Sequence, residues 1–149
     1  MRAVIQRVSE ARVSVGDELV GEIRAGVLVY LGVEKTDDAS DLRYVMDKLI
    51  ALRIWEDSQR KMNLSLRDVS GAVLLVSQFT LCGDTRSGRR PSFASAMAPT
   101  EARAMYERAI EILKSEGLEV ATGRFGATMA VYAVNDGPVT LLVDSKRLF

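Results

Sequence analysis

Hydrophobic and polar residues alternate near the start of the chain, as they do in half-buried β-strands. The alternation covers residues 3–9 and 11–15, which predicts two strands. Gly16 and Asp17 follow, and a glycine that supplies positive φ predicts a two-residue hairpin turn at this point. Residues 26–33 are almost continuously apolar, which indicates a strand buried on both faces.

The spacing of apolar residues then becomes helical in two segments. Asp37, Asp38 and Ser40 precede the first segment and are available to cap a helix N-terminus. A second helix is predicted over residues 100–115, with Gly117 as its C-terminal stop. The apolar stripe of the first helix consists of Leu42, Val45, Met46, Leu49 and Ile50, and that of the second consists of Ala102, Met105, Tyr106, Ala109, Ile110 and Leu113.

Short apolar runs outside these helices predict the remaining strands. Residues 82–92 contain turn-forming residues and three arginines, which indicates a loop. The further strands are predicted over residues 63–66, 72–81, 129–134 and 139–143. Strands outnumber helices in the order β-β-β-α-β-β-α-β-β, which indicates an α+β domain that covers residues 1–149.

Composition narrows the class of protein. With 149 residues and 48% hydrophobic content, the chain can bury one core but is too short for two ordinary domains. The single cysteine cannot form an intramolecular disulfide. Charged residues interrupt the N-terminus too early for a signal-peptide core, and no apolar run is long enough to span a membrane. We therefore expect a cytoplasmic protein with no membrane attachment. The 20 basic and 20 acidic residues balance, which argues against a global basic field but leaves room for a local patch.

The chain contains no histidine. This absence excludes a Ser-His-Asp or Cys-His relay, and it excludes a histidine-ligated zinc ion. One cysteine is also too few for a thiolate-rich metal site. If the chain is an enzyme, its acid–base requirements are light or are met by the substrate, and we expect neither a metal nor another cofactor.

Residues 77–81 are the first candidate for chemistry. Ser77, Gln78 and Thr80 bring three hydrogen-bonding side chains to the end of an apolar strand. Backbone N–H groups lose their ladder partners where a strand ends, and they can then point at a ligand oxygen. Spacing alone favours the simpler interpretation, a strand end whose polar side chains face solvent.

Residues 135–140, Asn-Asp-Gly-Pro-Val-Thr, are the second candidate. The X–Pro bond is the one type of peptide bond in which the cis isomer is affordable. Spacing alone again favours a simpler interpretation, a tight turn, because Asn-Asp-Gly promotes chain reversal. A proline inside a strand pair would instead mark an edge or a bulge.

Three arginines and one cysteine complete the candidates. Arg86, Arg89 and Arg90 suit phosphate through the fixed donor fork of the guanidinium group, although a solvated loop explains them equally well. Cys82 is interpreted as structural, because no histidine is present to lower its pKa. Thr80 is a poor nucleophile for a similar reason, since its hydroxyl has no evident base.

The two motifs together resemble the D-aminoacyl-tRNA deacylase family, of the D-tyrosyl-tRNA deacylase type. Residues 77–81 (Ser-Gln-Phe-Thr-Leu) and 135–140 match the diagnostic motifs of the family without change, in order and at the family's spacing. Residues 89–93 and 122–125 also match comparable stretches, and the resemblance spans essentially the whole chain. The match favours a functional interpretation of both motifs over the simpler ones.

The resemblance implies mainly antiparallel, barrel-like packed sheets with two principal helices, in a chain that assembles as a homodimer. The catalytic region it implies consists of Ser77, Gln78, Phe79 and Thr80.

The resemblance also assigns a chiral-selectivity element to Gly137 and Pro138. In the family their peptide bond is cis, and the segment enters the pocket of the partner subunit. Arg7 would help to fix that segment, and Phe125 and Met129 would help to line the pocket.

The implied activity is hydrolysis of the ester between a D-amino acid, or glycine, and the 3′ end of tRNA. This ester is already activated by its α-ammonium group, and the neighbouring ribose hydroxyl can assist proton movement, so the enzyme need only position the ester and stabilise the oxyanion. Our hypothesis assigns the oxyanion site to the backbone N–H groups of Phe79 and Thr80, with Thr80 as covalent nucleophile as the alternative. An L side chain would clash with rigid backbone, whereas a D side chain would point to solvent.

Two other functions stay open from the sequence. A hydrolase that uses Thr80 or Ser77 covalently would also cleave aminoacyl esters that lack the ribose 2′-hydroxyl. A noncatalytic RNA-binding or dimeric interaction module would grip phosphate through the arginine loop, and it would bind tRNA with marked salt dependence without breaking the ester. Both alternatives leave the pairing of the two motifs unexplained.

Overall fold

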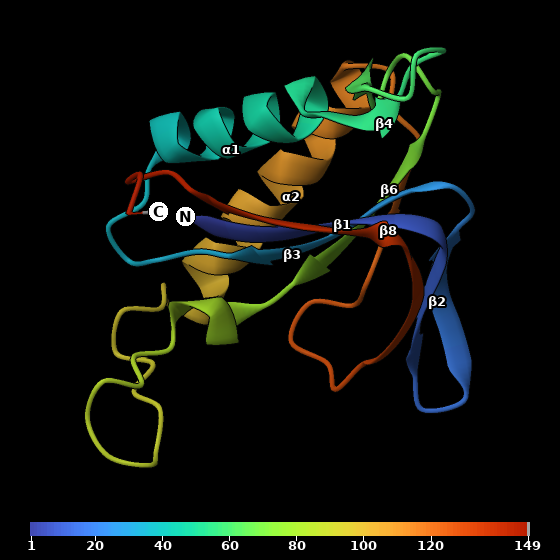
Figure 1. Ribbon diagram of the computed structural model, residues 1–149. Helices are drawn as coiled ribbons and strands as arrows, with labels where there is room; N and C mark the ends of the chain where they lie inside the picture. The colour runs from blue at the N-terminus through green and yellow to red at the C-terminus, as the bar shows by residue number, and fades with distance from the viewer. Residues whose placement is uncertain (149) are drawn as a thin grey trace.

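The computed structural model describes residues 1–148, in which one long strand organises a curled sheet (Figure 1). Strand β1 (Arg2–Val15) pairs along both of its edges. On one edge it runs antiparallel first to β3 (Gly26–Gly32) and then to β2 (Glu18–Ile23). On the other edge it runs antiparallel to β8 (Ala130–Asp144). The two strands predicted over residues 3–15 are therefore one strand, and the predicted hairpin that follows them is confirmed, with Gly16 at a φ of +57°.

Beyond β3 the sheet continues with parallel strands. Strand β6 (Ala72–Ser77) lies parallel to β3, and β7 (Val120–Thr122) lies parallel to β6, which gives the order β2-β1-β3-β6-β7. The sheet curls until its two ends meet, because a Cβ on Gly21 of β2 would lie only 2.4 Å from the carbonyl oxygen of Thr122 in β7. The predicted α+β class with a barrel-like, mainly antiparallel sheet is confirmed.

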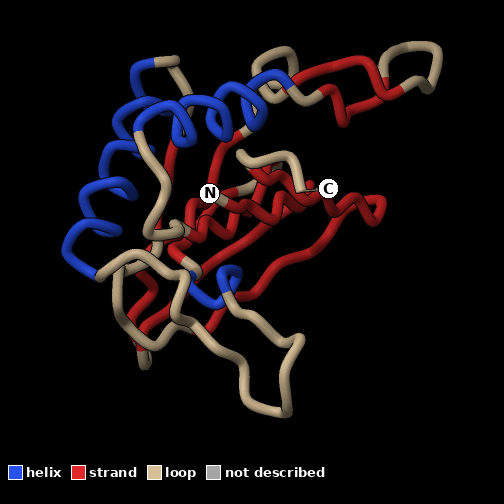
Figure 2. The backbone as a smooth tube through the Cα atoms, turned by 90° about the vertical axis from the view of Figure 1, so that its left-hand side faces the viewer, coloured by secondary structure: helices blue, strands red, loops and turns tan. Residues whose placement is uncertain are grey.

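Two helices cover one face of the sheet, as Figures 1 and 2 show. Helix α1 (Ala39–Ala51) begins at the predicted cap: the Asp38 side chain accepts from the backbone N–H of Asp41, whose side chain accepts from that of Asp38. Helix α2 (Pro99–Ser115) has proline in its first turn, where a missing N–H costs nothing. Neither these helices nor any other in residues 1–148 is long and apolar enough to cross a membrane.

Alternation along the strands divides the buried apolar residues between the two faces of the sheet. One cluster packs against the helices, and the other fills the inside of the curled sheet. Strand residues of the first cluster include Ala3, Ile5, Val27, Val29, Leu31, Val73 and Leu75, and those of the second include Val8, Val13, Leu28, Leu74 and Val76.

Two short strands were not predicted from the sequence, and β2 was indicated only as the second strand of the hairpin. Strand β4 (Arg53–Glu56) pairs with β5 (Met62–Ser65), of which only the second was expected, and β7 was missed altogether. Each missed strand is only three or four residues long, so alternation within it is too brief to be distinguished from a loop.

The strand predicted over residues 72–81 is wrong in its second part. Strand β6 ends at Ser77, and a single turn of 3-10 helix, η1 (Phe79–Cys82), follows. The partner strand β3 ends at Gly32, so the ladder has no further acceptors after the carbonyl of Leu31 accepts from Gln78. A Cβ on Gly32 would lie 2.8 Å from the Gln78 carbonyl oxygen, so glycine allows the chain to turn closely over the strand end.

The two strands predicted over residues 129–134 and 139–143 are in fact one strand, β8. The interpretation of residues 135–138 as a tight turn between strands is therefore wrong. The segment is an irregularity in a continuous antiparallel pair, because the register with β1 shifts between Gln6 and Val8 and again between Val8 and Glu10. A proline in a sheet is tolerated at such an irregularity.

Candidate active site

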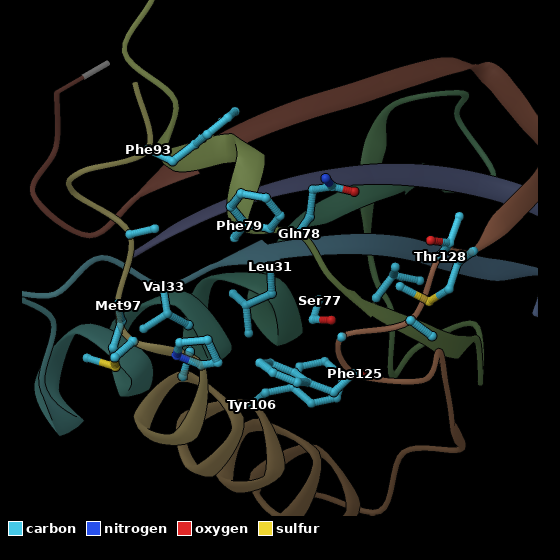
Figure 3. A pocket seen from close by; sticks show the side chains of 18 of the residues that line it. Leu31, Val33, Ser77, Gln78, Phe79, Phe93, Met97, Tyr106, Phe125 and Thr128 are labelled. Carbon is cyan, nitrogen blue, oxygen red and sulfur yellow. The ribbon is translucent and has the colours of Figure 1, made fainter. Parts of the chain in front are cut away.

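A cavity of about 740 Å³ opens where β3 and β6 end (Figure 3). Parallel strands place their carboxyl ends side by side, so Leu31 of β3 pairs with Ser77 of β6 and both line the cavity. The first turn of α2 and residues 125–129 complete the wall. Its volume is in the range of roughly 300–1,000 Å³ that is typical of small-molecule sites.

The first sequence motif lies at this cavity. Ser77, Gln78 and Phe79 line it, and Thr80 follows directly in η1. Phe79 and Thr80 are the first two residues of η1, and their backbone N–H groups donate to no protein acceptor within residues 1–148. N–H groups at the start of a helical turn have no partner inside it, so these two are available to a ligand oxygen.

The hydroxyl of Thr80 is held by a neighbouring amide. The Nε2 atom of Gln78 donates to Oγ1 of Thr80, and the Thr80 side chain is exposed. An amide donor cannot remove a proton, and a nucleophilic hydroxyl requires a base beside it. The geometry therefore leaves the Thr80 hydroxyl unactivated.

Two aromatic pairs stand on opposite sides of the cavity (Figure 3). The rings of Phe79 and Phe93 meet edge to face with their centroids 5.0 Å apart. The rings of Tyr106 and Phe125 lie 5.8 Å apart, and the Tyr106 hydroxyl donates to the carbonyl of Leu75 at 2.7 Å. Such rings supply flat apolar surface against which a nucleoside can pack.

Phe125 and Met129 come from the segment that connects β7 to β8. The guanidinium carbon of Arg103 lies 5.0 Å from the ring centroid of Phe125, in a cation–π contact. A Cβ on Gly123 would lie 2.6 Å from the Met129 sulfur, so glycine at this position gives Met129 the room to fold back. The structure thus brings both residues to the same cavity as residues 77–79.

Ionisable groups are almost absent from the cavity. Among its described lining residues only Tyr106 can titrate, and burial raises the pKa of its phenol. Cys82 lies outside the lining, where burial raises the pKa of its thiol to about 11 and its Sγ donates to the carbonyl of Val33 at 3.5 Å. The lining therefore offers no general base and no thiolate at neutral pH.

The second motif lies elsewhere on the same chain. Gly137 and Pro138 are exposed in the middle of β8 and do not line the cavity of their own chain, and the peptide bond between them is cis. Asn135 braces the segment, because its Nδ2 atom donates to the carbonyls of Arg7 and Val139 at 2.9 Å each.

The buried side chain of Arg7 contacts this segment from the protein interior. Its Nε atom lies 3.0 Å from the Asp136 carboxylate, and its Nη1 atom donates to the carbonyl of Ile54. A Cβ on Gly137 would lie 2.9 Å from Nη2 of Arg7. The structure therefore joins Arg7 to the Gly-Pro segment, while within one chain both stay apart from residues 77–80.

Sequence reasoning missed most of the apolar lining of the cavity. Leu31 belongs to a predicted strand, Tyr106 to a predicted helix stripe, and Met97 to no predicted element. The pairing of β3 with β6 would have indicated Leu31, because parallel neighbours end at one edge of a sheet. That pairing joins strands 46 residues apart (Gly26 with Ala72), and no local pattern reveals it.

Comparisons with known proteins converge on one family. The chain matches the family model described as D-Tyr-tRNA(Tyr) deacylase over residues 4–144. It is 55% identical to the D-aminoacyl-tRNA deacylase of Thermotoga petrophila over 149 residues, which is 100% of both chains. It is similar to a solved structure described as c-Myc DNA Unwinding Element Binding Protein, with a TM-score of 0.91, 37% identity, and coverage of 97% of this chain and 98% of the other. A structure described as a probable eukaryotic D-amino acid tRNA deacylase shares the fold, with a TM-score of 0.80, 21% identity, and coverage of 96% and 98%.

Proposed function

This chain belongs to the D-Tyr-tRNA(Tyr) deacylase family, and from that premise we propose that it hydrolyses the ester between a D-amino acid and the 3′ end of tRNA. The products are the free amino acid and tRNA, and glycine mischarged on tRNA is a second substrate. One observation carries the proposal. Within residues 1–148 the backbone N–H groups of Phe79 and Thr80, at the edge of the cavity, have no protein acceptor, and no described lining residue is an acid or base active at neutral pH. Such a site can stabilise an oxyanion but supplies no proton acceptor. It therefore suits an ester that is activated by its own α-ammonium group and assisted by its own ribose hydroxyl. A tRNA substrate places the activity in the cytoplasm.

In the proposed reaction, the N–H groups of Phe79 and Thr80 bind the oxyanion. Water adds to the ester carbonyl carbon, and the carbonyl oxygen takes up negative charge as the tetrahedral intermediate forms. The proton lost by the water reaches the departing 3′ oxygen through the ribose 2′-hydroxyl, and the C–O ester bond breaks. The protein positions the ester and supplies the two fixed N–H dipoles, and the ribose 2′-hydroxyl of the substrate relays the proton.

Covalent catalysis by Thr80 is the weaker alternative. Its hydroxyl accepts a hydrogen bond from Gln78, and the lining offers no base to deprotonate it. Ser77 lines the cavity but likewise has no basic side chain among its described neighbours in the lining. Neither hydroxyl is therefore activated to attack the ester carbon.

We assign chiral selectivity to a homodimer in which the partner subunit's Gly137 and the partner subunit's Pro138 complete the cavity. The segment is exposed, braced from below by Arg7, and remote from the cavity of its own chain. A rigid backbone placed over the cavity would meet the side chain of an L-amino acid and leave room for a D side chain or for glycine.

An apolar face on β8 supports this assembly. The large apolar side chains of Tyr132, Val134 and Leu142 are 45%, 41% and 59% exposed, and they flank the Gly-Pro segment along one strand. Exposed apolar side chains gathered beside a functional segment are typical of a protein–protein contact.

The test is release of amino acid from three substrates by the purified protein: D-tyrosyl-tRNA, glycyl-tRNA and the D-tyrosyl ester of 2′-deoxyadenosine. We expect release from the two tRNA substrates and strongly reduced release from the deoxynucleoside ester. Equal cleavage of the deoxynucleoside ester would favour the covalent hydrolase. Salt-dependent binding of tRNA with no release would favour the binding module.

A further inference from the structure

A basic loop projects from the rim of the cavity. Residues 83–92 form the loop at the lower left of Figure 1, and Arg86, Arg89 and Arg90 in it are exposed. Its one carboxylate, that of Asp84, accepts from Nε and Nη2 of Arg86 at 2.9 and 2.7 Å. Arg89 and Arg90 have no carboxylate partner within residues 1–148. The loop therefore carries two uncompensated positive charges on a chain of zero net charge.

The base of this loop is fastened to the cavity wall. The backbones of Asp84 and Ser92 exchange two hydrogen bonds of 2.8 and 2.9 Å, and Phe93 comes next in the chain. The ring of Phe93 packs edge to face on Phe79, and both rings line the cavity. At the other end of the loop, a Cβ on Gly83 would lie 3.0 Å from the Phe93 ring. The loop therefore begins and ends beside the cavity wall, and Arg90 precedes the lining residue Phe93 by three positions.

None of the described lining residues is cationic. The exposed positive charge beside the cavity comes from Arg103, which packs on the Phe125 ring, and from the loop that precedes Phe93. We propose that Arg89 and Arg90 bind backbone phosphates of the single-stranded 3′ end of tRNA. This inference rests on the proposed function, because the terminal aminoacyl nucleotide must occupy the cavity for the preceding phosphates to cross the rim. A guanidinium fork matches a phosphate in shape and charge, and contacts of this kind position a nucleic acid without reading its sequence.

The experiment compares a substrate that has these phosphates with one that lacks them. The variant Arg89→Gln/Arg90→Gln is assayed on D-tyrosyl-tRNA and on the D-tyrosyl ester of adenosine. We expect kcat/KM on the tRNA substrate to fall roughly tenfold at low salt, and kcat/KM on the nucleoside ester to stay unchanged. The slope of log kcat/KM against log salt becomes shallower by about 1.4 for tRNA, since each lost single-strand phosphate contact removes about 0.7.

A matched control removes two arginines elsewhere. Arg24 and Arg60 are exposed and make no ion pair within residues 1–148. Arg24 precedes β3 and Arg60 lies between β4 and β5, whereas the cavity lies where β3 and β6 end. Arg24→Gln/Arg60→Gln changes the net charge equally and is expected to leave both substrates unaffected.

Three results would overturn the inference: an equal loss on both substrates, no loss on either, or the same loss in the control variant. Binding of uncharged tRNA is measured in parallel, so that the inference does not depend on turnover. If the wild-type protein hydrolysed neither ester and the Arg89→Gln/Arg90→Gln variant still bound tRNA about tenfold more weakly, the loop would keep its role and the proposed function would fail.

Discussion

The guanidinium group of Arg7 lies directly against Gly137, where a Cβ would come within 2.9 Å of Nη2. The Arg7 side chain is almost fully buried, although Asp136, to which it bonds, lies at the surface. Gly137 has a φ of +117°, a conformation that L side chains rarely adopt. One buried arginine therefore supports an exposed segment whose backbone has room for glycine alone.

Gly137→Ala is expected to impair both stability and activity. The added methyl group would press on Arg7 and on the Val139 side chain, and the backbone strain costs about 1–3 kcal/mol of unfolding free energy. The proposed homodimer requires this segment to fit the partner's cavity, so we expect D-tyrosyl-tRNA hydrolysis to fall as well. Urea unfolding and the deacylation rate measure the two effects.

Gly117→Ala is the matched control for this variant. Gly117 has a φ of +80°, and a Cβ there would meet nothing within 4 Å. The control is expected to cost about 1 kcal/mol in stability and to leave the deacylation rate unchanged. An unaltered deacylation rate in Gly137→Ala would count against any role of the segment in catalysis or selectivity.

Substitutions at Thr80 distinguish catalysis by its backbone N–H group from catalysis by its side-chain hydroxyl. Thr80→Ala and Thr80→Ser are both expected to keep kcat within about threefold, since the proposed oxyanion donor is the N–H group and not the hydroxyl. Replacing residue 80 with the matching α-hydroxy acid removes that N–H, and we expect kcat to fall by about 10²–10³. A loss on the order of 10⁴ in Thr80→Ala, with retention in Thr80→Ser, would instead identify a covalent nucleophile.

Cys82→Ala is expected to change the pH dependence of the unfolding free energy at alkaline pH and to leave the activity unchanged. Burial raises its pKa to about 11 from an ordinary value of 9.0, so the unfolded chain loses the thiol proton at lower pH than the folded chain. The resulting stabilisation is complete below about pH 9 and is lost as the pH rises towards 11. The unfolding free energy of Cys82→Ala should therefore decline less over this range than that of the wild type. An inflection near pH 7 in kcat/KM that vanished in Cys82→Ala would contradict the structural role of the thiol.

Phe125→Ala is expected to weaken substrate binding more than it weakens the fold. The ring contacts Tyr106 and the Arg103 guanidinium at the cavity wall and is only half buried. We expect kcat/KM to fall roughly tenfold or more through a higher KM, and Phe125→Leu to restore part of the loss. A normal KM for D-tyrosyl-tRNA in Phe125→Ala would exclude the ring from the substrate-binding wall.

The elements with long, regular patterns could be predicted from the sequence. Helix α1, which Asp38 caps, and the buried strand β3 are both where the apolar spacing indicates them. The errors fall where tertiary pairing overrides local preference. Asn-Asp-Gly-Pro ordinarily reverses a chain, but continuous pairing of β8 with β1 and the hydrogen bonds of Asn135 hold it in a strand.

Only the motif residues of the candidate site could be predicted from the sequence. Ser77, Gln78 and Phe79 stand out as polar or aromatic residues at a strand end, and the structure places them in the cavity. The rest of the wall depends on contacts between distant parts of the sequence, such as the approach of α2 to the end of β6. The proposed contact of Gly137 with a partner's cavity involves two chains, so the spacing of residues within one chain does not indicate it.

The central claim is that the cavity accepts D-aminoacyl esters and rejects L-aminoacyl esters. The most direct test is the ratio of deacylation rates for D-tyrosyl-tRNA and L-tyrosyl-tRNA, measured with the same tRNA at the same enzyme concentration. A clash of the L side chain with backbone predicts rapid release of D-tyrosine and a rate for the L substrate at least about a hundredfold lower. Similar rates for the two enantiomers would contradict the account.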